Sequence, residues 1–496
     1  MTTTFIELLA GSSSTVTLPD GATTSASELA DRGRRISTGL QASGVNRGDR
    51  VAAWLDNGLA YLDLLAACAA GGFVLVNVNT RYNPVEAATL IGRSGATLVV
   101  TARGQELNVD VPTVSPLQLT AMTASPPDTY AVSDADPFLV FTTSGTTSKP
   151  KMVLHRQRSI VQHSFAVATA FRLSADTPAY VALPLCGVFG LNSFAAAVVA
   201  NSPLWLSAGF DAQTAAGLVE AESIVAMNGT DDMFHRMLAT DANLTSLRIC
   251  GYGAFNASLD DLVDRAAVRG ATLSGLYGMS EVQALLAFRD PSAPVTARKA
   301  AGGRLSSAAS AVRAIDPSTG AVCEPGVEGE LQIRGASLFA GYLAEGGASI
   351  DDDLTSRATH DGWFGTGDLG FVEDDRTFTF LSRMGDVLRL GGFLVAPAEI
   401  EEAVLSHPGI ADVQVVAATG PQGARPVAFV IVDPASGIAS IDEHAVIATC
   451  AAVLARFKCP VRVIEVSEFP TTDGPNGRKI QKARLRDLAQ AALEDA

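Results

Sequence analysis

Apolar and polar residues alternate along the first half of the chain with two different spacings. Alanine-rich stretches with helical spacing lie at 25–42, 59–70 and 84–94. Short runs of valine, leucine and other apolar residues lie between them, at 50–55, 74–78 and 96–101. The same rhythm returns between Phe165 and Glu281. Repeated strand–helix alternation predicts a mainly parallel sheet whose faces are covered by helices.

The pattern changes near Ala300. Short alternating segments such as Glu330–Arg334, separated by glycine, serine and proline turns, predict antiparallel strands or a small barrel. A final mixed pattern predicts a helix over 399–406 and strands over 413–416 and 427–432.

The length and charge of the chain limit the number of domains and the kinds of partner that can be expected. With 496 residues it is too long for one hydrophobic core and predicts several domains. We place the main boundary near Gly385, which separates residues 1–384 from residues 385–496. The net charge of −16 argues against nucleic acid as a partner, because binding it requires clustered cations. A few local lysines and arginines can still bind a small anionic ligand.

The spacing of the cysteines and the length of the apolar runs indicate the cellular compartment of the protein. Six cysteines are scattered without a Cys-x-x-Cys pair, which predicts reduced thiols rather than disulfides or a zinc site. The first residues lack the basic start and apolar core of a signal peptide, and the apolar runs are too short to span a membrane. We therefore expect a cytoplasmic protein without an integral membrane segment.

The segment from Phe141 to Lys151, FTTSGTTSKPK, has the composition of a phosphate-binding loop. Its backbone N–H groups, hydroxyls and ammonium groups can all donate hydrogen bonds to phosphate oxygens. It lacks the Gly-x-x-x-x-Gly-Lys-Ser/Thr spacing of the common nucleotide loop. The apolar run 138–141 predicts a buried strand that presents the loop at its carboxyl end. The alternative interpretation is a surface turn rich in serine and threonine.

Two further segments could complete a nucleotide site. The stretch Tyr277–Glu281 offers an aromatic ring for a purine, a hydroxyl for a phosphate and a carboxylate for Mg²⁺. The alternative is an ordinary strand and turn with Glu281 in solvent. In 362–370, Asp368 has two oxygens that can accept hydrogen bonds from two ribose hydroxyls. The alternative is a hairpin in which Asp368 caps a turn.

Two segments of the last third are less informative alone. Residues 383–393 contain Arg383 and the pair Gly391-Gly392, and residues 476–482 form a basic stretch around Lys479. By themselves they would be a linker and a solvated basic tail.

The order and content of these segments resemble the adenylate-forming (AMP-binding) superfamily, which includes acyl-CoA synthetases and ligases, peptide-synthetase adenylation domains and beetle luciferases. The resemblance covers nearly the whole chain, from 48–52 and 78–82 to 479–482. It implies an α/β fold with a large N-terminal domain of αβ-layered subdomains and a small β-barrel-like subdomain. A small mobile α+β domain would follow at the C-terminus.

The resemblance also implies a reaction. A carboxylate attacks the α-phosphate of ATP to give an acyl-adenylate and pyrophosphate, and the thiol of coenzyme A then displaces AMP. The implied cofactors are ATP, Mg²⁺ and coenzyme A, and the substrate is a small carboxylic acid, fatty or bulky. Two alternatives stay open: transfer to a carrier-protein phosphopantetheine or another nucleophile, and a catalytically inactive nucleotide-binding protein. The resemblance leaves a homodimer open.

Site residues follow from the same resemblance. Thr146 and Glu281 would bind Mg²⁺, and Tyr277 would pack on adenine. Lys479 would bridge the attacking carboxylate and the α-phosphate in the first half-reaction, with Arg478 and Lys482 as rivals. The nucleotide would be held by Thr143, Ser144, Gly145, Thr147, Lys151, Gly253, Ala254, Tyr277, Gly278, Ser280, Asp368 and Arg383. After rotation of the C-terminal domain, Gly391 and Gly392 would help build a pantetheine tunnel.

The chain departs from the family pattern at four positions. The family usually has glycine where this chain has Ser148 and Met152, and Asp or Lys at the hinge where it has Gly385. Glycine broadens the accessible backbone angles, so rotation should remain available there. Gly187 replaces an aromatic ring that commonly gates the carboxylate pocket, which predicts an acid that is bulky near its carboxylate or threads past this point. Alternatively, Phe189 fills the same volume.

Overall fold

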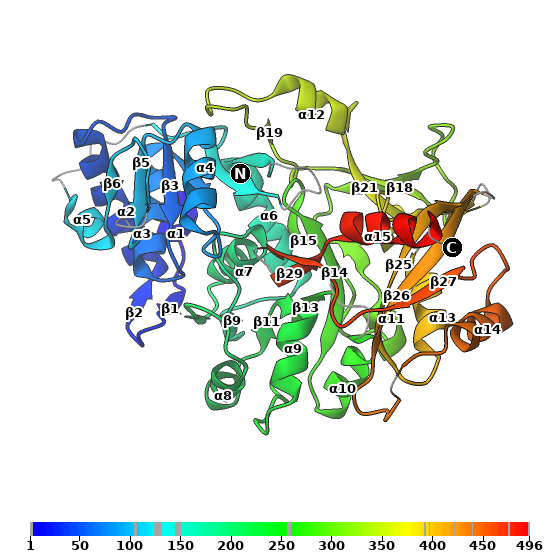
Figure 1. Ribbon diagram of the computed structural model, residues 1–496. Helices are drawn as coiled ribbons and strands as arrows, with labels where there is room; N and C mark the ends of the chain where they lie inside the picture. The colour runs from blue at the N-terminus through cyan, green and yellow to red at the C-terminus, as the bar shows by residue number, and fades with distance from the viewer. Residues whose placement is uncertain are drawn as a thin grey trace.

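The computed structural model describes residues 3–103, 107–123, 131–143, 150–254, 259–390, 393–395, 397–420, 423–438, 440–474 and 477–494. The chain runs from the blue helices and strands on the left of Figure 1 to the orange and red C-terminal part on the right. Three large sheets with their helices form the first part of the molecule, and three small sheets form the last part.

The first sheet has seven strands and carries the sequence expected to bind phosphate. Its order is β19-β8-β7-β4-β3-β5-β6, with β3 to β7 parallel and β8 and β19 antiparallel at one edge. The strands are β3 (Arg50–Trp54), β4 (Val74–Asn77), β5 (Leu98–Thr101), β6 (Thr113–Val114), β7 (Pro137–Thr142), β8 (Met152–Arg156) and β19 (Gly341–Tyr342). The helices of this region are α1 (Phe5–Ala10), α2 (Ala26–Ala42), α3 (Leu59–Gly71), α4 (Pro84–Ser94) and α5 (Pro116–Ala121).

Local sequence signals set the ends of α4. The Asn83 side chain accepts hydrogen bonds from the amides of Val85 and Glu86, the Glu86 carboxylate accepts one from the amide of Asn83, and Pro84 occupies the first turn. The helix ends at Gly95, whose φ of +61° is the left-handed conformation that glycine adopts readily. These signals are why the expected helix 84–94 matches the observed one.

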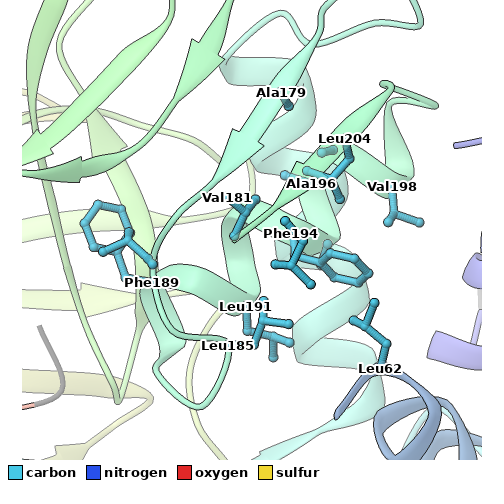
Figure 2. Close-up of a cluster of buried hydrophobic side chains, with 14 of the residues drawn as sticks. Leu62, Ala179, Val181, Leu185, Phe189, Leu191, Phe194, Ala196, Val198 and Leu204 are labelled. Carbon is cyan, nitrogen blue, oxygen red and sulfur yellow. The ribbon is translucent and has the colours of Figure 1, made fainter. Parts of the chain in front are cut away.

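The second sheet has five strands in the order β11-β9-β10-β1-β2. Its strands are β1 (Thr15–Thr17), β2 (Thr23–Ser25), β9 (Ala179–Val181), β10 (Leu204–Leu206) and β11 (Ala226–Met227). The helices beside it are α6 (Gln157–Ala170), α7 (Val188–Val199), α8 (Ala212–Glu222) and α9 (Asp231–Leu238). Figure 2 shows Leu62 of α3 beside Phe194 of α7, so one core joins the first two sheets.

The third sheet has ten strands and changes from parallel to antiparallel along its width. Its order is β12-β13-β14-β15-β16-β22-β21-β18-β17, with β20 beside β21. The strands are β12 (Gly229–Thr230), β13 (Cys250–Gly253), β14 (Leu273–Met279), β15 (Gln283–Phe288), β16 (Gly302–Leu305), β17 (Ala311–Ile315), β18 (Gly329–Arg334), β20 (Thr359–His360), β21 (Trp363–Asp374) and β22 (Thr377–Arg383). Its helices are α10 (Leu262–Val268), α11 (Val295–Lys299) and α12 (Asp352–Ala358). The antiparallel strands expected after Ala300 therefore extend the preceding sheet.

The last part of the chain packs around cores of its own. Two clusters of buried apolar side chains, drawn from residues 388–463 and 416–489, contain only residues that follow Gly385. The strands are β23 (Leu388–Leu390), β24 (Phe393–Val395), β25 (Ile410–Gly420), β26 (Gly423–Val432), β27 (Arg462–Glu465), β28 (Thr471–Gly474) and β29 (Gly477–Ile480). The helices are α13 (Pro397–Leu405), α14 (Glu443–Val453) and α15 (Lys482–Glu494).

Candidate functional site

The expected phosphate loop joins two antiparallel strands at the edge of the first sheet. Strands β7 and β8 pair up to Thr142 and Met152, and the amide of Thr143 donates to the carbonyl of Lys151 at 3.0 Å. The side chains of 138–141 are buried, so β7 is the buried strand that the sequence predicts before the loop. The predictions for Ser144, Gly145, Thr146, Thr147 and Ser148 lie outside the described residues.

Both ends of this loop carry groups suited to an anion. The Thr143 hydroxyl is buried and has no hydrogen-bond partner among the described residues, so it is free to donate to a ligand. The ammonium of Lys151 lies over the ring of Tyr342, 4.7 Å from the ring centroid. Tyr342 belongs to β19, which pairs with β8 next to the loop.

Ser280 and Glu281 lie in the tight turn between β14 and β15. Glu281 is only 7% exposed, so the alternative of a solvated carboxylate is wrong. Its Oε1 accepts a hydrogen bond from the Tyr342 hydroxyl at 3.0 Å, and its backbone carbonyl accepts one from the amide of Phe339 at 2.8 Å. The buried carboxylate is therefore held in place by the Tyr342 hydroxyl.

Two buried histidines form hydrogen bonds with backbone carbonyls on either side of Glu281. Burial lowers the pKa of His155 to about 4 and that of His163 to about 4, so both rings are neutral at ordinary pH. Nε2 of His155 lies 2.7 Å from the carbonyl of Ser280, and Nε2 of His163 lies 2.6 Å from that of Ala284. A neutral ring with its proton on Nε2 donates to each carbonyl. The pair thus pins the backbone on both sides of Glu281.

The strand that leaves the turn is held in an unusual conformation. Gln283 has a φ of +68° and Leu285 a φ of +62°, values that are uncommon for residues other than glycine. The Gln283 amide donates to the carbonyl of Ser159 at 2.8 Å and accepts from Asn192 at 3.0 Å. Such strain persists where surrounding contacts fix it, and it is frequent at functional sites.

Asp368 lies inside β21, opposite Arg383 of β22, and is 1% exposed. The alternative of a carboxylate that caps a turn is therefore wrong. Its Oδ2 accepts from the Tyr277 hydroxyl at 2.5 Å. Its Oδ1 forms an ion pair with Nη1 of Arg383 at 3.0 Å but accepts no hydrogen bond from the described residues. A buried carboxylate oxygen that accepts no hydrogen bond is suited to a ribose hydroxyl.

The environment of Asp368 shifts its ionisation. Burial raises the pKa of this carboxyl to about 6, although Arg383 and the Tyr277 hydroxyl act to lower it. The Tyr277 ring packs edge-on against Phe378, with centroids 5.1 Å apart, and lies 5.8 Å from Phe380. Tyr277 is 6% exposed, and Gly278 beside it is exposed.

The remaining predicted residues of the nucleotide pocket lie on neighbouring strands. Gly253 ends β13 in a buried position, and Ala254 after it is exposed. Strand β13 pairs with β14, which leads to Ser280 and Glu281. Tyr277 of β14 thus contacts Asp368 of β21, and Glu281 contacts Tyr342 of β19, although these residues lie far apart in the sequence.

The predicted hinge is anchored on both sides. The amide of Met384 donates to the carbonyl of Gly367 in β21 at 2.7 Å. Nη2 of Arg486, in α15, donates to the carbonyl of Gly385 at 2.6 Å and to Asp386 at 2.7 Å. A Cβ built on Gly385 would meet no described atom within 4 Å. Gly385, whose own carbonyl accepts from α15, therefore lies between Met384, bonded to β21, and Asp386, bonded to α15 and through its amide to the carbonyl of Arg383 at 2.9 Å.

Three predicted site residues of the C-terminal part, Gly391, Gly392 and Lys479, are not fully described by the structure. Gly391 and Gly392 lie outside the described residues. The backbone of Lys479 lies in β29, opposite Thr472 of β28, but its side chain is outside the described part of the chain. Their roles stay predictions.

Several residues of the site gave no signal in the sequence. Tyr342 and His155 stand in strands among apolar neighbours, so nothing marked them as different from core residues. Glu330, whose Oε1 accepts from the amide of Gly367 at 3.2 Å, was expected only as part of an alternating strand. Only pairing between distant strands brings these side chains to the site.

Within the described ranges there is no group of three or more metal-ligating His, Cys, Asp or Glu side chains. Magnesium is commonly held by one or two carboxylates together with substrate phosphates, so the single carboxylate of Glu281 fits that ion. No helix among the described residues is long and apolar enough to cross a membrane.

Comparison with protein families identifies the class of this chain. The model of the AMP-binding enzyme family matches residues 10–343, and that of the AMP-binding enzyme C-terminal domain matches residues 399–474. The chain belongs to the family of AMP-binding enzymes. This assignment confirms the resemblance to adenylate-forming enzymes drawn from the sequence.

Individual proteins sharpen the comparison. The chain is 30% identical over 477 residues to a feruloyl-CoA synthase of Amycolatopsis sp., with 92% of each chain covered. ATP-bound MatB from Rhodopseudomonas palustris has a TM-score of 0.86 and 24% identity, covering 99% of this chain and 100% of that chain. O-succinylbenzoate coenzyme A synthetase (MenE) from Bacillus subtilis, in complex with ATP and magnesium ion, has a TM-score of 0.84 and 22% identity, covering 97% of this chain and 98% of that chain. The expected α/β fold, with a large N-terminal and a smaller C-terminal domain, is confirmed.

Proposed function

We propose that this protein is an ATP-dependent, AMP-forming acid–CoA ligase. In the first step a carboxylate oxygen attacks the α-phosphorus of ATP and pyrophosphate leaves. In the second, the sulfur of coenzyme A attacks the acyl carbon, a thioester forms and AMP leaves. The observation that carries the proposal is the proximity of three charged groups: Lys151 and Glu281 both contact Tyr342, and the charge of Glu281 acts on Asp368. Family membership and the similarity to a feruloyl-CoA synthase support it.

Different side chains would bind different parts of the nucleotide. Asp368 offers the ribose its Oδ1, which accepts no hydrogen bond from the described residues, and Arg383 supplies the cation that pairs with this oxygen. Thr143 and Lys151 would bind the β- and γ-phosphates, together with Ser144, Gly145 and Thr147. Glu281, with Thr146, would hold Mg²⁺, which neutralises phosphate charge when bound. Lys479 would stabilise the charge that develops at the α-phosphate.

We also propose that residues 1–384 and 385–496 form two domains that move about Gly385. Support comes from the separate apolar cores after Gly385 and from the ties that hold Met384 to β21 and Asp386 to α15. Rotation there would allow Gly391 and Gly392 to reach the site in the thioester step.

The acid is proposed to carry a ring near its carboxylate. Gly187 stands immediately before α7, at the position where the family commonly has an aromatic ring, and contributes no side chain there. Phe189 is buried and points away from the labelled core of Leu62, Leu185 and Phe194 in Figure 2, so its ring lies on the other side of α7. Two similar proteins, feruloyl-CoA synthase and O-succinylbenzoate coenzyme A synthetase, are named after ring-bearing acyl groups, which also supports a ring-bearing acid.

Product analysis tests these proposals together. The purified protein would be incubated with Mg²⁺, ATP and short, long and ring-bearing acids, with and without coenzyme A. Pyrophosphate, AMP and a thioester with a ring-bearing acid are expected. Pyrophosphate without thioester would indicate a carrier protein or another acceptor, and no product with any acid would indicate an inactive nucleotide-binding protein. If acetate or propionate were the best substrate, the proposal of a bulky acid would be wrong.

A further inference from the structure

Tyr342 is held rigidly at the centre of the nucleotide site. It is 2% exposed, and its strand β19 pairs with β8 beside the phosphate loop. Its amide donates to the hydroxyl of Thr355 at 3.0 Å. Its ring packs edge-on against Phe339, with centroids 4.8 Å apart. Backbone and ring are both fixed, so the side chain has little freedom to rearrange when a ligand binds.

The two ends of this tyrosine contact opposite charges. Its hydroxyl donates to Oε1 of Glu281 at 3.0 Å, and its ring face lies 4.7 Å from the ammonium of Lys151. A phenol hydroxyl is a good donor to a carboxylate, and the negative face of an aromatic ring attracts a cation. One side chain therefore touches both the proposed magnesium ligand and the proposed phosphate-binding cation.

Neither charged group is neutralised by a partner in the described part of the chain. Lys151 and Glu281 form no ion pair with each other or with another described residue. A direct ion pair between them would satisfy both groups and would have to be broken as the nucleotide enters. The ring interaction with Lys151 is weaker than a close ion pair, so the ammonium can turn to a phosphate at little loss.

We propose that Tyr342 is a positioning residue that separates Lys151 from Glu281 and holds one for the phosphates and the other for Mg²⁺. The proposal rests on the function proposed above. It assigns the tyrosine no contact with the reacting atoms. Its effect is preorganisation: the cation and the carboxylate already occupy separate places when magnesium–ATP arrives.

Two substitutions separate the two contacts. Tyr342→Phe removes the hydroxyl bond to Glu281 and keeps the ring beneath Lys151, whereas Tyr342→Leu removes both. Binding to the full-length protein would be measured by titration calorimetry with magnesium–ATP and with ATP in EDTA. We expect Tyr342→Phe to bind magnesium–ATP about tenfold more weakly, as for loss of a hydrogen bond to a charged group, with metal-free ATP unchanged. Tyr342→Leu should weaken both.

Two controls exclude a general structural effect. Tyr180, in β9, is another buried tyrosine, and its hydroxyl lies near the side chain of Ser207. Tyr180→Phe removes a comparable hydroxyl away from the site and should bind magnesium–ATP like the wild type. In a Glu281→Gln background, Tyr342→Phe should add less than a twofold change, because the carboxylate through which it acts has gone.

Two results would overturn the proposal. One is magnesium–ATP binding by Tyr342→Phe within twofold of the wild type. The other is equal weakening with and without the metal, which would mean a general loss of structure. Failure of the proposed function gives a different pattern, because the wild type itself would then form no pyrophosphate with any acid. An active wild type with an unaffected Tyr342→Phe contradicts only the role of Tyr342.

Discussion

The turn that carries Glu281 and the proposed hinge at Gly385 differ in the contacts that hold them. The turn is fixed by two histidines on its carbonyls, a buried amide network and the Tyr342 hydroxyl on its carboxylate. At the hinge, one open glycine lies between two anchored neighbours. Contacts thus hold the proposed nucleotide-binding turn, whereas a side chain at Gly385 would meet open space. This contrast suits an enzyme that performs two reactions at one nucleotide site.

Removing the proposed catalytic lysine should give the largest effect and should affect one half-reaction. Lys479→Ala is expected to slow acyl-adenylate formation about 1,000-fold, because a cation that stabilises the transition state is lost. Thioester formation from supplied acyl-AMP should stay close to the wild-type rate. Separate assays of the two half-reactions measure this split, and retained adenylation would remove Lys479 from its role.

Loosening the fixed turn should have the next largest effect. His155→Phe leaves the carbonyl of Ser280 without its buried donor, which should lower the free energy of unfolding by about 1–3 kcal/mol. Magnesium–ATP binding should weaken as well, because Glu281 follows directly. His155→Gln restores an N–H donor and should recover part of the loss. Denaturant titration measures the stability, and equal stability of all three proteins would contradict this account of the turn.

Acidity should weaken ribose binding about tenfold for each pH unit below the pKa of Asp368. That pKa is raised to about 6 by burial, with Arg383, Tyr277, Glu281 and Glu330 as the charged or titratable neighbours. The ionised carboxyl accepts ribose hydroxyls, so binding is strongest above pH 6. The same shift has the opposite sign for stability. Because the folded pKa lies above the ordinary value of 3.8, stability is greatest below that value and falls as the pH rises through 6.

Adenosine is the appropriate probe for this pH effect, since it carries no phosphate that titrates near neutrality. Its dissociation constant would be measured from about pH 5 to pH 8 for the wild type and Asp368→Asn. The wild type should bind more weakly as the pH falls, and the variant should show a flat, weak profile. If adenosine binding by Asp368→Asn still depended on pH, a group other than Asp368 would cause the pH effect.

The smallest effect is expected at the hinge. A Cβ at Gly385 meets no described atom within 4 Å, so Gly385→Ala should leave the free energy of unfolding unchanged or raise it by less than about 1 kcal/mol. Alanine restricts the backbone, so the thioester step should slow about two- to fivefold while adenylation is unaffected. A larger loss in adenylation than in thioester formation would argue against a hinge at this residue.

Local signals explain what could be predicted from the sequence. Helices 26–42, 59–71 and 84–94 lie within one residue of their expected bounds, because caps, glycine stops and apolar spacing act over a few residues. The buried strand before the phosphate loop and the grouping of Asp368 with Arg383 and Tyr277 were predicted as well, the latter through the family resemblance.

Long-range pairing explains what could not be predicted. Tyr342 reaches Glu281 only because β19 adds to β8, and His155 reaches Ser280 across 125 residues. Both side chains sit in apolar strands, where the sequence pattern indicates only burial. The burial of Glu281 likewise depends on strands that lie far apart in the chain.

Acid-dependent exchange of labelled pyrophosphate into ATP, without coenzyme A, tests the central claim most directly. Exchange reports reversible formation of an acyl-adenylate and does not require the thioester step. The account predicts rapid exchange with a ring-bearing carboxylic acid and magnesium, and only background exchange when the acid is omitted. Absence of exchange with every carboxylic acid, in protein that binds magnesium–ATP, would contradict the claim that this site activates carboxylates.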